Sequence, residues 1–177
     1  MVARVFLCAL ALSCCQTPLP AQAPKPLSKD QVRTAAIDIM NAARYCTLAT
    51  IASDGQPQAR IVDPFAPEQD LTIWIATNAS SRKVDEIRRD PRVTLLYFNT
   101  AASEYVTVIG TALVTTDPKQ KAAHWKTDWA TFYKNQNKGD DYVLIRVTPS
   151  RLEVVSEKRG IRTDPKTWRP TTIVIPR

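Results

Sequence analysis

The strongest constraint on the fold is a series of short segments rich in Val, Ile, Thr and aromatic residues, separated by turn-forming residues. Such segments favour β-strands, and the Asp54-Gly55 pair between the first two is typical of a hairpin turn. Hairpin-like spacing of this many strands predicts an antiparallel sheet that closes into a small barrel. The expected strands are 45–52, 57–65, 70–78, 92–98, 104–116 and a last segment, 141–156, that a turn near Pro149 divides in two.

Helical patterns interrupt this β-rich stretch. Ser28 and Gln31 have the spacing of a capping box, and an apolar stripe with helical periodicity follows them. A second, short helix is expected to begin at Ser80 or Ser81 and to stop at Asp90, because a proline comes next. The chain is therefore predicted to be mainly β with α, with six to seven antiparallel strands and flanking helices.

The region after the long fifth strand is predicted to form a third helix. Asp117 and Pro118 have the residue types of an N-cap and a first helical turn, and Gly110 within the preceding strand indicates a bulge. Four aromatic residues are expected on one face of this helix, where they would pack in the core or cover a ligand: Trp125, Trp129, Phe132 and Tyr133.

The first 23 residues have the layout of a secretory signal. Arg4 precedes a short apolar run, and small residues and prolines follow up to an "AQA" that resembles a peptidase site. The apolar run is too short to span a bilayer, so no transmembrane segment is expected. We expect an exported protein, periplasmic or extracellular, with a linker over 24–28. A lipoprotein modified at Cys14, which ends "ALSC", is the alternative.

The sequence contains few groups for acid–base or metal chemistry. His124 is the single histidine, has no cysteine or acidic partner at ligand spacing, and is expected at the surface or at the edge of a pocket. Cys46 is the only cysteine outside the leader, so no internal disulfide is expected, and its apolar surroundings favour a buried role. If the protein is an enzyme, a cofactor is therefore expected to supply its chemistry. No metal site is expected.

The stretch "SSRKV" has the residue types of an anion site. Ser81 offers a hydroxyl group, the start of a helix offers free N–H groups, and Arg82 and Lys83 add positive charge. Arg60, on an earlier strand, supplies another cation, and the formal net charge of +7 suits an anionic partner. An ordinary capped helix with an exposed Arg-Lys pair explains the same residues. From these residues alone, both interpretations stay open.

The order of these motifs resembles a known family. "ARIVDPF", "LTIWIATNASSRKVDEIRRDPRVTLLYF" and "YVTVIGTA" look like the FMN-binding split barrel of the pyridoxamine 5′-phosphate oxidase type, nearest to its general stress protein branch. The resemblance covers residues 43–156. It implies a split β-barrel over 29–156 that binds FMN, followed by a C-terminal tail, 157–177.

The resemblance also implies roles for particular residues. Arg60, Arg82 and Lys83 would hold the FMN phosphate, with support from Ser81. Ile61 and Val62 would present backbone groups to the flavin ring, and Ala76 and Thr77 would contact the cofactor.

Such proteins are usually homodimers with the flavin at the subunit interface. Tyr105 would reach the flavin from the other subunit, at a position where the true oxidases have a glutamine. The C-terminal segment, from Glu153 onward, does not match the substrate-binding end of those oxidases, so a vitamin B6 oxidase is not expected. The expected function is a flavin-dependent oxidoreductase with a small electron donor or acceptor. The alternatives are a flavin-binding, stress-related module without turnover, or a split barrel that uses F420 or haem. The predicted export signal argues against a nucleic-acid partner.

Overall fold

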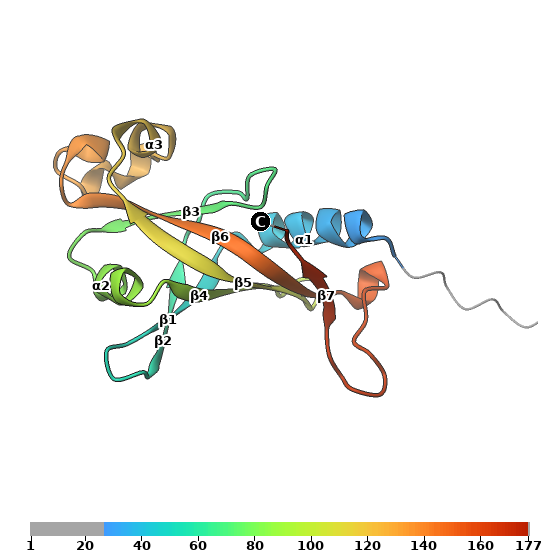
Figure 1. Ribbon diagram of the computed structural model, residues 1–177. Helices are drawn as coiled ribbons and strands as arrows, with labels where there is room; N and C mark the ends of the chain where they lie inside the picture. Colours follow the sequence, from blue (N-terminus) through green and yellow to red (C-terminus); the bar gives the residue numbers. More distant parts are fainter. Residues whose placement is uncertain (1–26, 177) are drawn as a thin grey trace, which may run out of the picture.

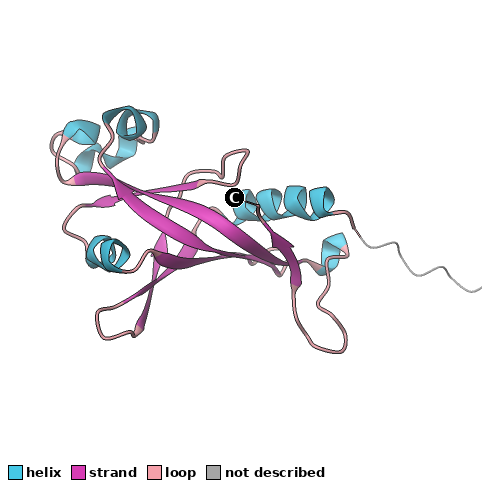
Figure 2. Ribbon diagram, viewed as in Figure 1, coloured by secondary structure: helices cyan, strands magenta, loops and turns pink. Residues whose placement is uncertain are grey.

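The protein is one curled antiparallel sheet with helices at its margins (Figures 1 and 2), seen in a computed structural model that describes residues 27–176. The expected six- to seven-stranded split barrel, mainly β with α, is confirmed. The predicted signal peptide, the linker up to Pro26 and the alternative lipid site at Cys14 lie outside the described residues and stay predictions. The strands are β1 (Cys46–Ile51), β2 (Pro57–Val62), β3 (Ile73–Asn78), β4 (Arg92–Asn99), β5 (Glu104–Thr115), β6 (Tyr142–Val155) and β7 (Thr171–Val174).

The strand order explains why the barrel is split. Hydrogen bonding runs β2-β1-β4-β5-β6-β3, so β2 and β3 are the two ends of the path and do not pair with each other. β7 pairs with the C-terminal half of β6, on the edge where β3 pairs with the N-terminal half. An edge strand has backbone N–H and C=O groups that no neighbouring strand uses. The gap between β2 and β3 is therefore lined by free backbone groups.

The turn expected near Pro149 is absent, because β6 is a single strand of 14 residues. Pro149 lies opposite Gly110, where the register between β5 and β6 shifts and forms the expected bulge. A proline without an N–H group is tolerated at such an irregularity. A Cβ atom on Gly110 would lie 2.3 Å from the backbone oxygen of Thr148, so the close approach of the two strands requires glycine.

Two helices follow the sequence prediction closely. The N-terminal helix α1 (Lys29–Ala43) begins with the expected capping box at Ser28, and it packs on β4 and β5. Helix α2 (Arg82–Arg89) joins β3 to β4 and buries Val84 and Ile87 against β1 and β5. Within residues 27–176, no helix is both long enough and apolar enough to cross a membrane.

The prediction of one long aromatic helix is wrong. Helix α3 (Pro118–Ala123) ends before the first aromatic residue, and two short 3-10 turns follow, η1 (Thr127–Thr131) and η2 (Gln136–Lys138). The carbonyl of His124 accepts a hydrogen bond from the Tyr142 hydroxyl, so this carbonyl is used by β6 and not by a continuing helix. This irregular path lets the aromatic rings pack from several directions.

These rings form a second, smaller core at one end of the sheet. Trp125 and Trp129 pack around Tyr142, with ring centroids 5.2 and 6.4 Å from it. His124 is not at a pocket edge, because its ring packs against Phe65 and Trp74 at centroid distances of 5.0 and 4.6 Å. The expected surface histidine is thus part of the aromatic packing.

Candidate functional site

A pocket of about 430 Å³ lies in the gap between β2 and β3, and we call it the gap pocket. Its walls come from both gap strands, from the start of α2 and from the segment around η1. The lining residues are Ile61, Val62, Asp63, Ala76, Thr77, Asn78, Lys83, Trp129, Phe132 and Tyr133. Five of the nine residues implied by the family resemblance therefore meet at one pocket, although they come from three separate segments.

Lys83 provides the cation on the wall of the gap pocket. Its half-buried ammonium group donates a hydrogen bond of 2.7 Å to the Thr77 hydroxyl, which lies 3.2 Å from the Ser81 hydroxyl. Burial lowers the pKa of Lys83, and the charge of Arg60 lowers it further, while Glu86 acts in the opposite direction. The lowered pKa means that the surroundings of Lys83 do not fully compensate its positive charge. A bound anion would therefore stabilise its charged form.

The start of α2 adds backbone donors beside Lys83. Ser81 occupies the N-cap position, but its side chain makes no capping hydrogen bond. Within residues 27–176, the backbone N–H groups of Arg82 and Lys83 have no acceptor. Free N–H groups and the helix dipole together favour an anion at this position.

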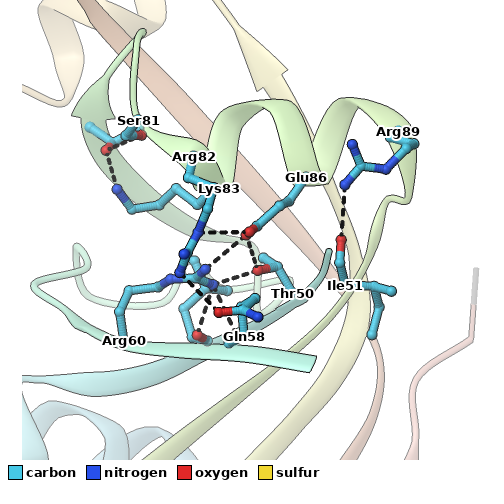
Figure 3. A network of polar contacts seen from close by, with 11 residues as sticks. Thr50, Ile51, Gln58, Arg60, Ser81, Arg82, Lys83, Glu86 and Arg89 are labelled. Carbon is cyan, nitrogen blue, oxygen red and sulfur yellow. Dashed lines mark hydrogen bonds and ion pairs between the residues drawn. The ribbon is translucent and has the colours of Figure 1, made fainter. Parts of the chain in front are cut away.

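Arg60 does not line the gap pocket. Its side chain lies on the inner face of β2, where it is 19% exposed, and its Nη1 donates to Thr50 and to the backbone oxygens of Leu48 and Gln58. Its Nη2 lies 2.8 Å from Oε2 of Glu86 (Figure 3). Hydrogen bonds to these acceptors therefore hold the Arg60 side chain outside the gap pocket.

Glu86 is the central acceptor of this cluster, and sequence reasoning missed it. Its side chain is 3% exposed, accepts a 2.5 Å hydrogen bond from the Thr50 hydroxyl, and lies 3.0 Å from Nε of Arg82. Burial alone would raise the pKa of Glu86, but the Thr50 hydrogen bond and the nearby Arg60 lower it overall. The i,i+4 spacing of Arg82 and Glu86 was a readable signal for one of these pairs.

The side chains around Glu86 carry a net positive charge. Three cations, Arg60, Arg82 and Lys83, face the single carboxylate of Glu86, which leaves two net positive charges near the start of α2. Arg82 is 69% exposed and also donates to the side-chain oxygen of Gln58, so it lies outside the gap pocket. Lys83 is thus the implied phosphate-binding residue whose side chain reaches the pocket itself.

The aromatic wall of the gap pocket comes from the segment after α3. Trp129 is half-buried and Tyr133 buried, whereas Phe132 is 75% exposed at the pocket. Core packing, one of the two roles expected for Phe132, is therefore wrong for this residue. An exposed ring beside a concave pocket provides a flat contact surface for a ligand.

The outer face of the sheet carries exposed apolar residues that lead away from the gap pocket. Ile61, on the pocket wall, is 67% exposed, and it shares the partner Thr47 with Leu96 of β4. Phe98 is 53% exposed and pairs with Tyr105 of β5. Tyr105 therefore lies across the sheet from the gap pocket and does not line it within its own chain.

Metal-binding chemistry is not indicated in this part of the molecule. Among residues 27–176, no three His, Cys, Asp or Glu side chains lie together in a group that could hold a metal ion. Asp63 is the acidic residue of the gap pocket, and it is paired with Lys126 and Arg44 at 3.0 and 3.4 Å. Burial would raise its pKa, but hydrogen bonds from these two cations lower it overall, so Asp63 stays ionised.

Comparison with known proteins identifies a family. Residues 33–156 match the family described as pyridoxamine 5′-phosphate oxidase, which covers most of the chain and all residues of the gap pocket. A search of curated proteins returned no match.

Solved structures show the same fold. General Stress Protein 26 from Bacillus anthracis str. Sterne has a TM-score of 0.65 at 20% identity, covering 81% of this chain and 98% of that protein. A Clostridium acetobutylicum protein related to general stress protein 26 has a TM-score of 0.66 at 15% identity, covering 83% and 95%. A pyridoxamine 5′-phosphate oxidase-related, FMN-binding protein from Nostoc punctiforme has a TM-score of 0.57 at 15% identity, covering 86% and 100%.

Proposed function

The chain belongs to the pyridoxamine 5′-phosphate oxidase family, and on that premise we propose that it binds FMN in the gap pocket and acts as a flavin-dependent oxidoreductase. The observation that carries the proposal is the half-buried Lys83 on the pocket wall, next to the free N–H groups at the start of α2. The Nostoc punctiforme protein, which has the same fold, is named as an FMN-binding protein, and this supports the choice of FMN.

The donors at the start of α2 fit a phosphate monoester. Such a group carries about −1.5 to −2 charges near neutral pH and accepts several hydrogen bonds. Lys83 and the two backbone N–H groups provide donors on one side, and the Ser81 hydroxyl lies next to them. The net charge of the cluster with Glu86 is of similar size and opposite sign to that of the phosphate. We infer that Arg60 and Arg82 act through this field rather than by reaching into the pocket.

The rest of the gap pocket fits a large planar ring. A volume of about 430 Å³ lies within the range of about 300–1,000 Å³ that is usual for ligand pockets. The free edge of β2 at Ile61 and Val62 provides backbone groups for polar ring atoms, and Trp129 and Phe132 provide an apolar wall. Bound FMN would supply the electron transfer. The residues of the chain bind its phosphate, orient the ring and limit access of water.

The cofactor assignment is tested by the colour and ligand preference of the protein. We expect protein purified from its own host to show the visible absorbance of oxidised flavin, and apoprotein to bind FMN at least tenfold more tightly than riboflavin, which lacks the phosphate. A titration followed by flavin fluorescence measures both affinities. Colourless protein that takes up no FMN would contradict the proposal, and an F420 or haem spectrum would favour those alternatives.

Turnover is tested separately, because binding alone does not make an enzyme. Reduction of the bound flavin by NADH or NADPH, followed by reoxidation with a panel of small acceptors, would distinguish an oxidoreductase from a stress-related flavin-binding module. The substrate and the physiological electron donor are the targets of this screen.

We further propose that the protein is a homodimer, with the outer face of the sheet at its interface. Ile61 belongs both to the gap pocket and to this exposed apolar face, so the pocket wall continues onto it. A second subunit packed on this face would bury Ile61, Leu96 and Phe98. It would also allow Tyr105 of that subunit to approach the flavin.

Replacement of Phe98 by glutamate is expected to convert the dimer to monomer, because a charged side chain would be buried at the centre of the interface. Light scattering after size-exclusion chromatography measures the mass. Leu113→Glu is the control, since Leu113 is 56% exposed on β5 but eight residues from Tyr105. Wild-type protein that runs as a monomer, or a Phe98→Glu protein that stays dimeric, would contradict this interface.

A further inference from the structure

The C-terminal tail, residues 157–176, lies outside the family match, which ends at residue 156. It consists of the short helix η3 (Glu157–Arg159), a loop and strand β7. In Figure 1 the loop that leads into β7 extends away from the sheet, at the end of the molecule opposite α3. We call residues 162–170 the tail loop. None of its residues belongs to the barrel core or lines the gap pocket.

The tail loop has a defined shape that its own hydrogen bonds maintain. The N–H of Trp168 donates to the carbonyl of Asp164, and the N–H of Asp164 donates to the carbonyl of Arg169, both at 2.8 Å. The Asp164 carboxylate accepts hydrogen bonds from the N–H groups of Thr167 and Lys166, and these bonds lower its pKa. The loop therefore presents its remaining side chains to the surroundings in a defined arrangement.

Trp168, near the end of the tail loop, is 79% exposed, the largest exposed fraction of any large apolar side chain within residues 27–176. The other tryptophans are buried or half-buried: Trp74, Trp125 and Trp129. A tryptophan combines an apolar ring with an N–H group, and for this reason it is enriched where an apolar phase meets water. One exposed ring alone is common on protein surfaces, so the charges beside it decide its interpretation.

Trp168 stands between two exposed cations, Lys166 and Arg169. The tail loop has three cations and one carboxylate, an excess of two positive charges, and that carboxylate is already engaged by the hydrogen bonds within the loop. The third cation, Arg162, pairs with Glu157 at 2.9 Å. Lys166 and Arg169 form no ion pair within the described part of the chain. The exposed ring is therefore flanked by two cations that are open to an anionic partner.

These features fit a lipid surface better than a folded partner. A stable protein interface buries roughly 800 Å² on each side, around a closely packed apolar centre. A loop of nine residues with a single large apolar side chain is too small for such an interface. A bilayer surface requires no matching shape, because an aromatic ring can enter between the headgroups while lysine and arginine attract anionic lipids.

The N-terminal part of the fold lies at the same end of the molecule. Leu27, the first described residue, lines a pocket of about 380 Å³ together with Arg159 of η3. The predicted leader and the alternative lipid site at Cys14 precede Leu27 in the sequence. A membrane contact by the tail loop would therefore lie at the end where the leader joins the fold.

We propose that the tail loop binds the surface of a membrane that contains anionic phospholipids. The Trp168 ring enters the region between the headgroups and the acyl chains, and Lys166 and Arg169 contact lipid phosphates. The contact is peripheral and reversible, because one ring and two cations amount to a single weak membrane signal. It does not depend on flavin binding in the gap pocket.

Sedimentation with lipid vesicles tests the charges, with the protein as its host produces it. Vesicles of phosphatidylcholine with phosphatidylglycerol are anionic, whereas phosphatidylcholine alone is neutral and measures any binding by the leader. We expect saturable binding to the anionic vesicles, which weakens at high salt because the charges are screened. Replacing Lys166 and Arg169 together by glutamine should weaken this binding about fivefold for each charge removed.

Lys119→Gln with Lys134→Gln is the matched control for these charges. Both lysines are exposed and form no ion pair within the described residues, and they lie at the opposite end of the molecule, in and after α3. The control lowers the net charge of the protein by the same amount, so it should leave vesicle binding almost unchanged.

Tryptophan fluorescence tests the position of the ring. Anionic vesicles should shift the emission of the wild type to shorter wavelength, and Trp168→Phe should abolish this shift, since the other tryptophans are buried or half-buried. Trp168→Ala should weaken vesicle binding roughly tenfold or more, because about half of the 150–250 Å² of a tryptophan leaves water on insertion. Thermal unfolding of each variant checks that it is folded.

Equal sedimentation with neutral and anionic vesicles, or no sedimentation with either, would overturn the proposal. So would a shift of the emission that persists in Trp168→Phe, or equal losses in the control and in the Lys166 and Arg169 double variant. If Trp168→Ala converts a dimer to monomer, the tail loop belongs to the interface between subunits and the membrane assignment is wrong.

Discussion

Replacing Lys83 by alanine should weaken FMN binding by roughly 10- to 150-fold, because one charge-assisted hydrogen bond to phosphate contributes about 1.5–3 kcal/mol. Lys83 is the phosphate-binding candidate whose side chain lines the gap pocket. Arg82→Ala should cost clearly less, since Arg82 is 69% exposed and already paired with Glu86. Fluorescence titration of the apoprotein with FMN measures both effects. The double variant, Arg82→Ala with Lys83→Ala, should bind FMN most weakly.

Riboflavin and pH provide the controls for this result. Riboflavin lacks the phosphate, so its affinity should be almost the same in wild type and in Lys83→Ala. Because the pKa of Lys83 is lowered in the free protein, FMN affinity should decline as alkaline pH removes its proton, at a lower pH than for an ordinary lysine. Lys83→Arg keeps its charge throughout this range and should lose that decline. Equal FMN affinities in wild type and Lys83→Ala would refute the phosphate position.

Replacing Glu86 by glutamine should lower the free energy of unfolding by about 3 kcal/mol, at the low end of what losing one partner of a buried ion pair costs. The low end applies because Arg60 keeps 19% exposure and three other acceptors. Chemical denaturation measures the change. Asp85→Asn is the matched control on the same helix, because the Asp85 side chain is 71% exposed and its pair with Arg88 should contribute little.

The same substitution should change the response of the protein to acid. The pKa of Glu86 in the folded state lies below its ordinary value of 4.5, so the stability it contributes is fully present above that pH. This stability is lost as the pH falls through the folded-state pKa. Wild type should therefore lose more stability than Glu86→Gln below about pH 4.5. If Glu86→Gln unfolds like Asp85→Asn at every pH, the buried pair does not stabilise the barrel.

Local patterns in the sequence were sufficient for much of the fold. The capping box at Ser28, the hairpin at Asp54-Gly55 and the bulge at Gly110 each depend on a few neighbouring residues, and each is present. Pro149 was misread because a proline commonly marks a turn. In this protein a bulge between two long strands accommodates it. The aromatic segment was misread because its spacing resembles a helix, while packing against Tyr142 determines its actual path.

The sequence by itself determined the donors at the start of α2. Ser81, Arg82 and Lys83 are consecutive at a helix start, so their hydroxyl, charges and free N–H groups are close together whatever the rest of the chain does. The family resemblance added the neighbouring strand residues that meet them at the gap pocket. These parts of the site depend on short-range geometry, which residue order specifies directly.

Only the tertiary structure decided which cations face the pocket. Arg60 and Glu86 are 26 positions apart, and they meet because closure of the barrel places α2 over the inner face of β2. That contact turns Arg60 away from the gap pocket and leaves Lys83 at its wall. A smaller pocket, lined by Met40, Phe65 and Tyr97 among others, likewise depends on α1, β4 and the segment after β2 packing together. Contacts of this kind depend on how distant segments pack, and the spacing of residues along the chain does not contain that information.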